Sequence, residues 1–167
     1  MKHRLMMVVG AGAMFGVLLL PASGQGALPG GESCVLSGSA TISPGLKSTP
    51  QNGTVTFSGS LGLCHGSMLG IKNGTVSGSA TGLGSCAASN DTLNATINWS
   101  NGMTSTISGA HLVSVGPLAN VAGTITGGAF AGSPVGAEAV FQPVGLLGAT
   151  QCAKAGVTNV TFKGATW

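Results

Sequence analysis

Apolar and small residues alternate with serine and threonine along most of the chain. The segment SCVLSGSATIS, residues 33–43, puts five apolar or small residues on one face, from Cys34 to Ile42. The segment GTVTFSGSLGL, residues 53–63, does the same from Val55 to Leu63, with hydroxyl residues opposite. A period of two is typical of β-strands that bury one face.

The same pattern predicts about eight strands, at 34–42, 54–63, 74–81, 92–99, 103–115, 121–131, 135–144 and 157–166. Gly and Pro turn pairs separate them, and no segment after residue 24 shows helical periodicity. Short strands at regular spacing are typical of sandwiches and barrels. We therefore predict one all-β domain at 33–167, either an antiparallel β-sandwich of immunoglobulin-like type or a small barrel.

The segment INWSNGMTSTI, residues 97–107, predicts a β-hairpin around Asn101-Gly102. A two-residue turn and a three-residue loop at 100–102 are both conceivable. The three-residue loop pairs Trp99 with Met103, keeps the apolar residues on one face and gives Gly102 the left-handed place in a bulge. It is favoured, with Trp99 on the core face near one end of the sheet. The alternative is a partly exposed Trp99 in a surface or pocket that binds a ligand.

The start of the chain resembles a secretory signal peptide. Lys2, His3 and Arg4 precede an apolar run at 5–20, and Pro21 and small residues follow. The run is shorter than the roughly 20 residues that span a bilayer. We expect a signal peptide at 1–24, a flexible segment at 25–32, and no transmembrane segment after cleavage. The protein is then secreted, either extracellular or associated with the cell wall, and the signal and composition are typical of bacteria.

Four cysteines in an exported chain predict two disulfides. Of three possible pairings we favour Cys34–Cys64, which would clamp the first hairpin, and Cys86–Cys152, which would tie the middle of the chain to its end. In strict strand register Cys34 would meet Leu63 rather than Cys64. The first pairing therefore requires a bulge, or a loop that starts near Gly62.

Charged residues are sparse after residue 24. Four lysines stand against three acidic residues, and there is no arginine. Nucleic-acid binding needs a basic patch that neutralises phosphates, so this class is excluded. No Cys-x-x-Cys pair occurs and His65 and His111 are far apart, so no metal site is predicted.

Candidate catalytic residues are few. Nothing brings two of the acids Glu32, Asp91 and Glu138 together, and Glu138 is expected on the solvent face of its strand. His111 shares the parity of Ile107 and is expected at a core or edge position, whereas His65 is expected to be solvated. Neither a G-x-S-x-G elbow nor a nucleotide-binding motif occurs. We therefore predict a protein without catalytic residues or cofactors, and not an enzyme.

Four segments together resemble a group of uncharacterised small secreted proteins of actinobacteria. They are SGSATISPGL, GTVTFSGSLGLC, TINWSNGMTSTI and GTITGGAFAGSPV. The resemblance covers most of residues 33–166 and implies export, four cysteines and Gly/Ser/Thr-rich strands. In composition alone the chain is also similar to neocarzinostatin-like apoproteins, which are small secreted β-sandwiches that hold an apolar chromophore. Those proteins have closely spaced cysteine pairs, which this chain lacks.

Of two functions, non-catalytic action by surface contacts is favoured from the sequence, and a small-molecule carrier is the alternative. Ser/Thr-rich outer faces favour a non-catalytic protein that acts by surface contacts in the extracellular space or cell envelope. Many Gly and Ala residues at inward positions favour instead a carrier with an apolar pocket between sheets for a small apolar ligand. A cavity of sufficient size would distinguish the second from the first.

Overall fold

The computed structural model describes residues 33–65, 69–143 and 148–167. The predicted signal peptide at 1–24 and flexible segment at 25–32 lie outside them. The elements are β1 (Ser33–Leu46), β2 (Gln51–His65), β3 (Gly74–Gly84), β4 (Ala88–Trp99), β5 (Thr104–Val115), β6 (Leu118–Gly128), β7 (Pro134–Pro143), α1 (Gly148–Ala153) and β8 (Val157–Thr166). Strands stand at all eight predicted places, and the first four are longer than predicted.

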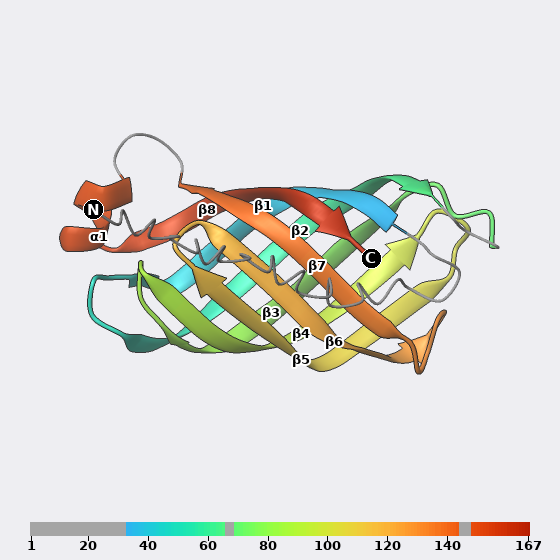
Figure 1. Cartoon of the computed structure of the whole chain (residues 1–167), viewed down its shortest axis with the longest axis horizontal. Helices are drawn as coiled ribbons and strands as arrows, with labels where there is room; N and C mark the ends of the chain where they lie inside the picture. Colours follow the sequence, from blue (N-terminus) through green and yellow to red (C-terminus); the bar gives the residue numbers. More distant parts are fainter. Residues whose placement is uncertain (1–32, 66–68, 144–147) are drawn as a thin grey trace, which may run out of the picture.

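The eight strands form a closed barrel in which each strand pairs antiparallel with its neighbours in sequence (Figure 1). The barrel closes because β8 also pairs with β1, from Cys34 opposite Thr166 to Thr41 opposite Asn159. Closure leaves no free sheet edge. The all-β prediction is confirmed, and of its two alternatives the structure shows the barrel and not the sandwich.

Aromatic rings fill the middle of the barrel where glycines face inward. A β-carbon at Gly38 would lie 2.5 Å from Cζ of Phe162, and one at Gly78 would lie 2.8 Å from Cζ of Phe57. Phe162 is buried and makes an edge-to-face contact with Phe141, with ring centroids 6.3 Å apart. Part of the space that the inward glycines leave is thus taken by these rings, which form a packed waist.

The first predicted disulfide, Cys34–Cys64, is present, and so is the bulge that it requires. Ser33 pairs with His65 and Val35 pairs with Gly62, so two residues of β2 lie opposite Cys34. Leu63 takes a positive φ of 48° and turns outward, where its side chain is 72% exposed. The extra residue brings Cys64 to the inner face that Cys34 occupies.

A second bulge, in β5, overturns the prediction for His111. Leu93 pairs with Ala110 and Ala95 pairs with Ile107, so two residues of β5 stand opposite Asn94. Gly109 takes a φ of 71°, and its N–H donates a hydrogen bond to Oδ1 of Asn94. The bulge reverses the parity of the strand beyond it. His111 therefore faces outward and is exposed, whereas the next residue, Leu112, faces inward and is buried.

The helix α1 was not predicted. It has six residues, too few for a helical period to show in the sequence. It carries Cys152 to Cys86, which lies in the turn between β3 and β4, and so completes the second predicted disulfide. No helix among the described residues has the length and apolar character needed to cross a membrane.

Candidate functional site

A cavity of about 600 Å³ opens at one end of the barrel. It is the end at which α1 lies (Figure 1). Seven of the eight strands contribute residues to its wall, and so do α1 and three of the turns; β6 contributes none of the described lining residues. Most of its lining is apolar, and these residues are Ile42, Pro44, Leu46, Val55, Leu112, Pro117, Phe141, Val157 and Val160. Phe141 rests on Phe162, so the packed waist lies below the cavity.

Small side chains at inward positions leave this end hollow. Gly53 of β2 pairs with Gly82 of β3, and Gly84 pairs with Ser89 of β4, which in turn pairs with Ser114 of β5. All five residues line the cavity. The opposite end carries large inward side chains instead, among them Leu61, Ile97, Trp99, Ile107 and Ile125. The sequence therefore makes one end of the barrel solid and the other open.

Backbone hydrogen bonds join the turns around the mouth to one another. The N–H of Cys86 donates to the carbonyl of Lys47 at 2.8 Å, which ties the β3–β4 turn to the β1–β2 turn. The N–H of Gly116 donates to the carbonyl of Ala87 at 2.7 Å, which ties the β5–β6 turn to the β3–β4 turn. Three of the turns at the mouth are thus held to one another by backbone hydrogen bonds.

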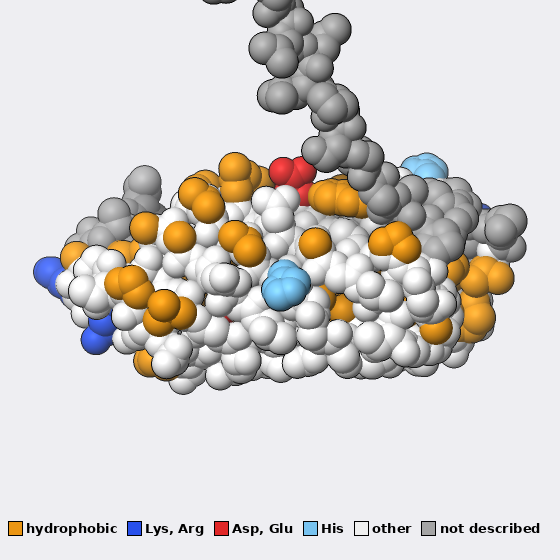
Figure 2. All heavy atoms as spheres, turned by 60° about the horizontal axis from the view of Figure 1, so that its bottom comes forward, with side chains coloured by type: hydrophobic (Ala, Val, Ile, Leu, Met, Phe, Trp, Pro, Cys, Tyr) orange, Lys and Arg blue, Asp and Glu red, His pale blue; other side chains and the backbone are white. Residues whose placement is uncertain are grey.

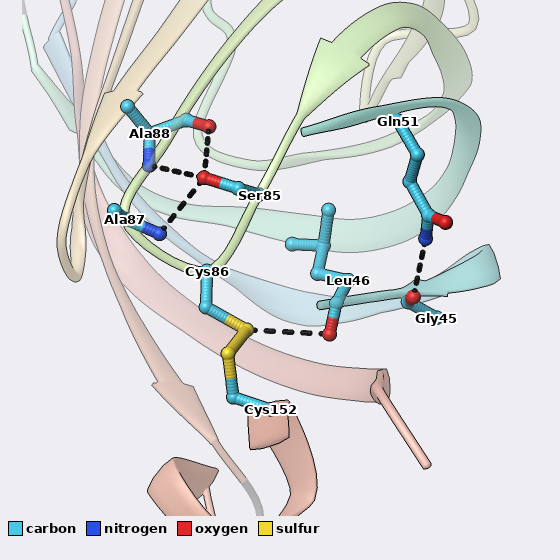
Figure 3. Close-up of a disulfide and its surroundings, with 8 residues drawn as sticks. All are labelled: Gly45, Leu46, Gln51, Ser85, Cys86, Ala87, Ala88 and Cys152. Atoms are coloured by element: carbon cyan, nitrogen blue, oxygen red, sulfur yellow. Dashed lines mark hydrogen bonds between the residues drawn. A yellow bond between two sulfur atoms is a disulfide. The ribbon is translucent and has the colours of Figure 1, made fainter. Parts of the chain in front are cut away.

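The Cys86–Cys152 disulfide reinforces this rim (Figure 3). Its Cys86 sulfur lies 3.2 Å from the carbonyl oxygen of Leu46. This is a van der Waals contact and not a hydrogen bond, because a disulfide sulfur has no proton to donate. Beside it, Oγ of Ser85 accepts the N–H of Ala87 at 3.2 Å and holds the tight turn. The disulfide thus fixes α1 to the mouth of the cavity.

Several polar side chains that line the cavity have a hydrogen-bond partner, and Asp91 has none among the described residues. Nε2 of Gln51 donates to the carbonyl of Gly45 at 2.7 Å, and the hydroxyls of Ser89 and Ser114 lie 2.9 Å apart. Asp91 is only 6% exposed and faces inward between Gly82 and Leu112. Within the described part of the chain, no hydrogen bond or ion pair reaches its carboxylate.

The sequence prediction assigned no role to Asp91, although the signal was available. In β4 the buried residues are Leu93, Ala95, Ile97 and Trp99, and the same alternation extended backward reaches Asp91. An acidic residue on the core parity of a strand is unusual because burial of an unpaired charge is costly. That conflict between residue type and position points to a site.

Trp99 lies away from the cavity, at the other end of the barrel. It is 4% exposed, and its Nε1 donates to Oγ of Ser105 at 2.8 Å. Its ring meets Phe130 edge to face at 5.8 Å. The hairpin is the predicted three-residue loop, since the N–H of Trp99 donates to the carbonyl of Met103 and Gly102 has a φ of 83°. Trp99 is therefore a packed core residue and not a surface or pocket aromatic.

The remaining candidate residues do not gather at one place. His65 and Glu138 are exposed, as predicted. Among the described residues there is no group of three or more His, Cys, Asp or Glu that could hold a metal ion. The candidate site is thus the barrel-end cavity with its single acidic side chain.

The outer wall carries a second feature near the mouth. Val115 of β5 pairs with Leu118 of β6, which pairs with Val140 of β7, and all three are exposed, as is Val113. These four residues form the outer apolar patch. Figure 2, which views the barrel from the β5 side, shows hydrophobic side chains scattered among uncharged ones, a histidine near the middle of the face, and acidic and basic side chains toward its margins.

Comparison of the sequence with protein-family models finds no matching family. Comparison with curated proteins finds none with significant similarity.

Proposed function

We propose that this protein is a non-catalytic carrier that binds a small, largely apolar molecule in the barrel-end cavity. The cavity itself carries the proposal. Its volume of about 600 Å³ lies within the roughly 300–1,000 Å³ of ligand pockets, and its wall is mainly apolar. Barrels of eight strands are of a size that can hold one small ligand.

The built rim supports this function. Hydrogen bonds between turns and the Cys86–Cys152 disulfide hold the mouth in one shape. A site that is already ordered loses little conformational entropy when a ligand enters, so more of the interaction energy appears as affinity. A mouth that needed only to be closed would carry large apolar side chains instead of Gly84, Ser89 and Ser114.

The place of action that we propose is outside the cytoplasm. Two disulfides persist in oxidising surroundings, and the predicted signal peptide at 1–24 supports export to the extracellular space or cell wall. A carrier there would shield a poorly soluble molecule from water.

Titration with N-phenyl-1-naphthylamine, a neutral dye that fluoresces in apolar surroundings, tests the proposal. We expect saturable binding of one dye per barrel. The double variant Ser89→Ala/Ser114→Leu fills the mouth and removes both partners of one hydrogen bond, so it should weaken binding about tenfold or more. Thr106→Leu, on the exposed outer face of β5, is the matched control and should bind as the wild type does. Absence of saturable binding to the wild type would refute the carrier function.

A second function, action by surface contacts in the envelope, is favoured by the outer apolar patch. Exposed apolar side chains on three adjacent strands are a common mark of a contact surface. Val115→Ser/Leu118→Ser should then reduce co-sedimentation of the protein with cell-wall fragments of its host, with dye binding unchanged. Equal sedimentation of variant and wild type would exclude this patch as the contact.

A further inference from the structure

Asp91 poses a problem that the packing of the protein does not solve. Its carboxylate is removed from solvent except where the cavity reaches it, and its neighbours across the strands are Gly82 and Leu112. A β-carbon at Gly82 would lie 2.7 Å from Oδ1 of Asp91, so the carboxylate lies directly over this glycine. The site thus has room for Asp91, and the described residues provide its carboxylate with no partner.

The other polar side chains of the cavity lining do not bind the carboxylate of Asp91. Gln51 donates to Gly45, Ser85 is engaged with its own turn, and Ser89 is paired with Ser114. The described lysines, Lys47, Lys72, Lys154 and Lys163, are all exposed, and none forms an ion pair with Asp91. A buried carboxylate without a cation or donor is destabilising, and a folded protein rarely retains one without a use for it.

We infer that the molecule carried in the cavity is a cationic amphiphile, whose protonated amine pairs with Asp91 and whose apolar body fills the rest of the cavity. This inference rests on the proposed function and names the ligand class. A carboxylate is only an acceptor, and an ammonium supplies both the opposite charge and N–H donors. The apolar lining then buries the hydrocarbon part of the same molecule.

The depth of Asp91 decides between this ligand and an anionic one. Lys47 and Lys154 lie at the same end of the barrel and would favour an acidic head group at the mouth. Both are exposed, so water and salt screen their charges. Asp91 is 6% exposed and its interaction with a bound charge is screened far less. A fatty acid would also bring a second negative charge into the cavity of Asp91.

The experiment compares three ligands with the same ten-carbon chain. Decylamine, decan-1-ol and decanoate each displace N-phenyl-1-naphthylamine from the wild-type protein at neutral pH. We expect decylamine to bind about tenfold or more tightly than decanoate, with decan-1-ol between them. Asp91→Asn should bring the ratio of the decylamine and decanoate affinities close to one, each affinity being calculated from the dye affinity measured for that variant.

Glu138→Gln is the matched control, because it removes an acidic charge from the exposed outer face of β7. It should leave the preference for decylamine unchanged. Should Asp91→Asn fail to fold, Asp91→Ser tests the same loss of charge.

The outcomes separate the two proposals. If the dye binds but the three ten-carbon compounds bind with equal affinity, or decanoate binds most tightly, the inference of a cationic ligand is wrong and the carrier function still stands. A preference for decylamine that survives in Asp91→Asn also overturns it. If neither the dye nor any ten-carbon compound binds, the carrier function fails, and the inference about its ligand fails with it.

Discussion

The two ends of β4 carry inward polar groups with opposite fates. At the solid end, Nε1 of Trp99 donates to Oγ of Ser105, which donates in turn to the carbonyl of Ala129 at 2.6 Å. Every polar atom in that chain has a partner. At the open end, the carboxylate of Asp91 has none among the described residues, and the space beside it is empty of protein.

The difference shows how one strand serves two purposes. Large apolar side chains and a satisfied hydrogen-bond chain contribute to stability at the solid end. Glycine, serine and an unpaired acid reduce stability at the open end, and such local conflicts are typical of functional sites. If the two ends are independent, changes at the solid end should alter stability without altering ligand binding at the open end.

The largest effect is expected from Trp99→Ala at the solid end. Loss of a buried indole and its contact with Phe130 should lower the free energy of unfolding by about 3–5 kcal/mol, measured by urea denaturation. Trp99→Phe keeps a ring but loses the bond to Ser105, and should cost distinctly less. The folded molecules of both Trp99 variants should bind the dye at the open end with unchanged affinity. A loss of dye affinity in the folded Trp99→Phe protein would show that the ends are coupled.

The two disulfides offer a matched comparison. Removal of Cys34–Cys64 or Cys86–Cys152 as paired alanine variants should each cost roughly 2–4 kcal/mol, because each closes a long loop in the unfolded chain. Only the second should also weaken dye binding, because only that bridge lies at the mouth. Equal loss of dye binding in both variants would argue against a rim that is shaped locally.

A smaller effect is expected from Gly109→Ala in the β5 bulge. The φ of 71° disfavours any side chain, although no atom lies within 4 Å of the added β-carbon. The cost in unfolding free energy should be about 1–2 kcal/mol. Gly127→Ala is the control, because its β-carbon makes only an ordinary contact with Thr106 and its φ is not positive. Equal costs for both would contradict the account of the bulge.

That bulge also shows how far sequence reasoning reaches. Alternation located all eight strands, and the apolar pattern around Trp99 selected the correct hairpin loop. Both depend on residues close in sequence. The predicted inward orientation of His111 was wrong, because one extra residue at Ser108-Gly109 reverses which side chains of β5 face inward beyond that point. The only local sign of the bulge was a glycine inside a strand.

Closure and the cavity depend on contacts between distant residues. The choice of barrel over sandwich rests on the pairing of β1 with β8, the first strand with the last, for which no local pattern exists. The cavity arises because small residues of several strands coincide at one end, and other inward glycines accommodate Phe57 and Phe162 instead. Composition predicted room inside the fold and did not predict where that room would lie.

The smallest expected effect, that of Asp91→Asn at the open end, is an increase in stability rather than a loss. Asp91→Asn removes an unpaired buried charge while it keeps the shape of the side chain, so it should raise the free energy of unfolding of the ligand-free protein by about 1 kcal/mol. Glu138→Gln, at an exposed position, should change it by less than about 0.5 kcal/mol. Urea denaturation of both variants beside the wild type measures this. Excess decylamine should then reverse the order, because a ligand that binds only the folded state stabilises it by an amount that grows with the logarithm of its concentration over its Kd, and the Kd is lower for the wild type. If Asp91→Asn is instead destabilising without ligand, the carboxylate contributes to the packing of the open end, and the contrast between the two ends of β4 does not hold.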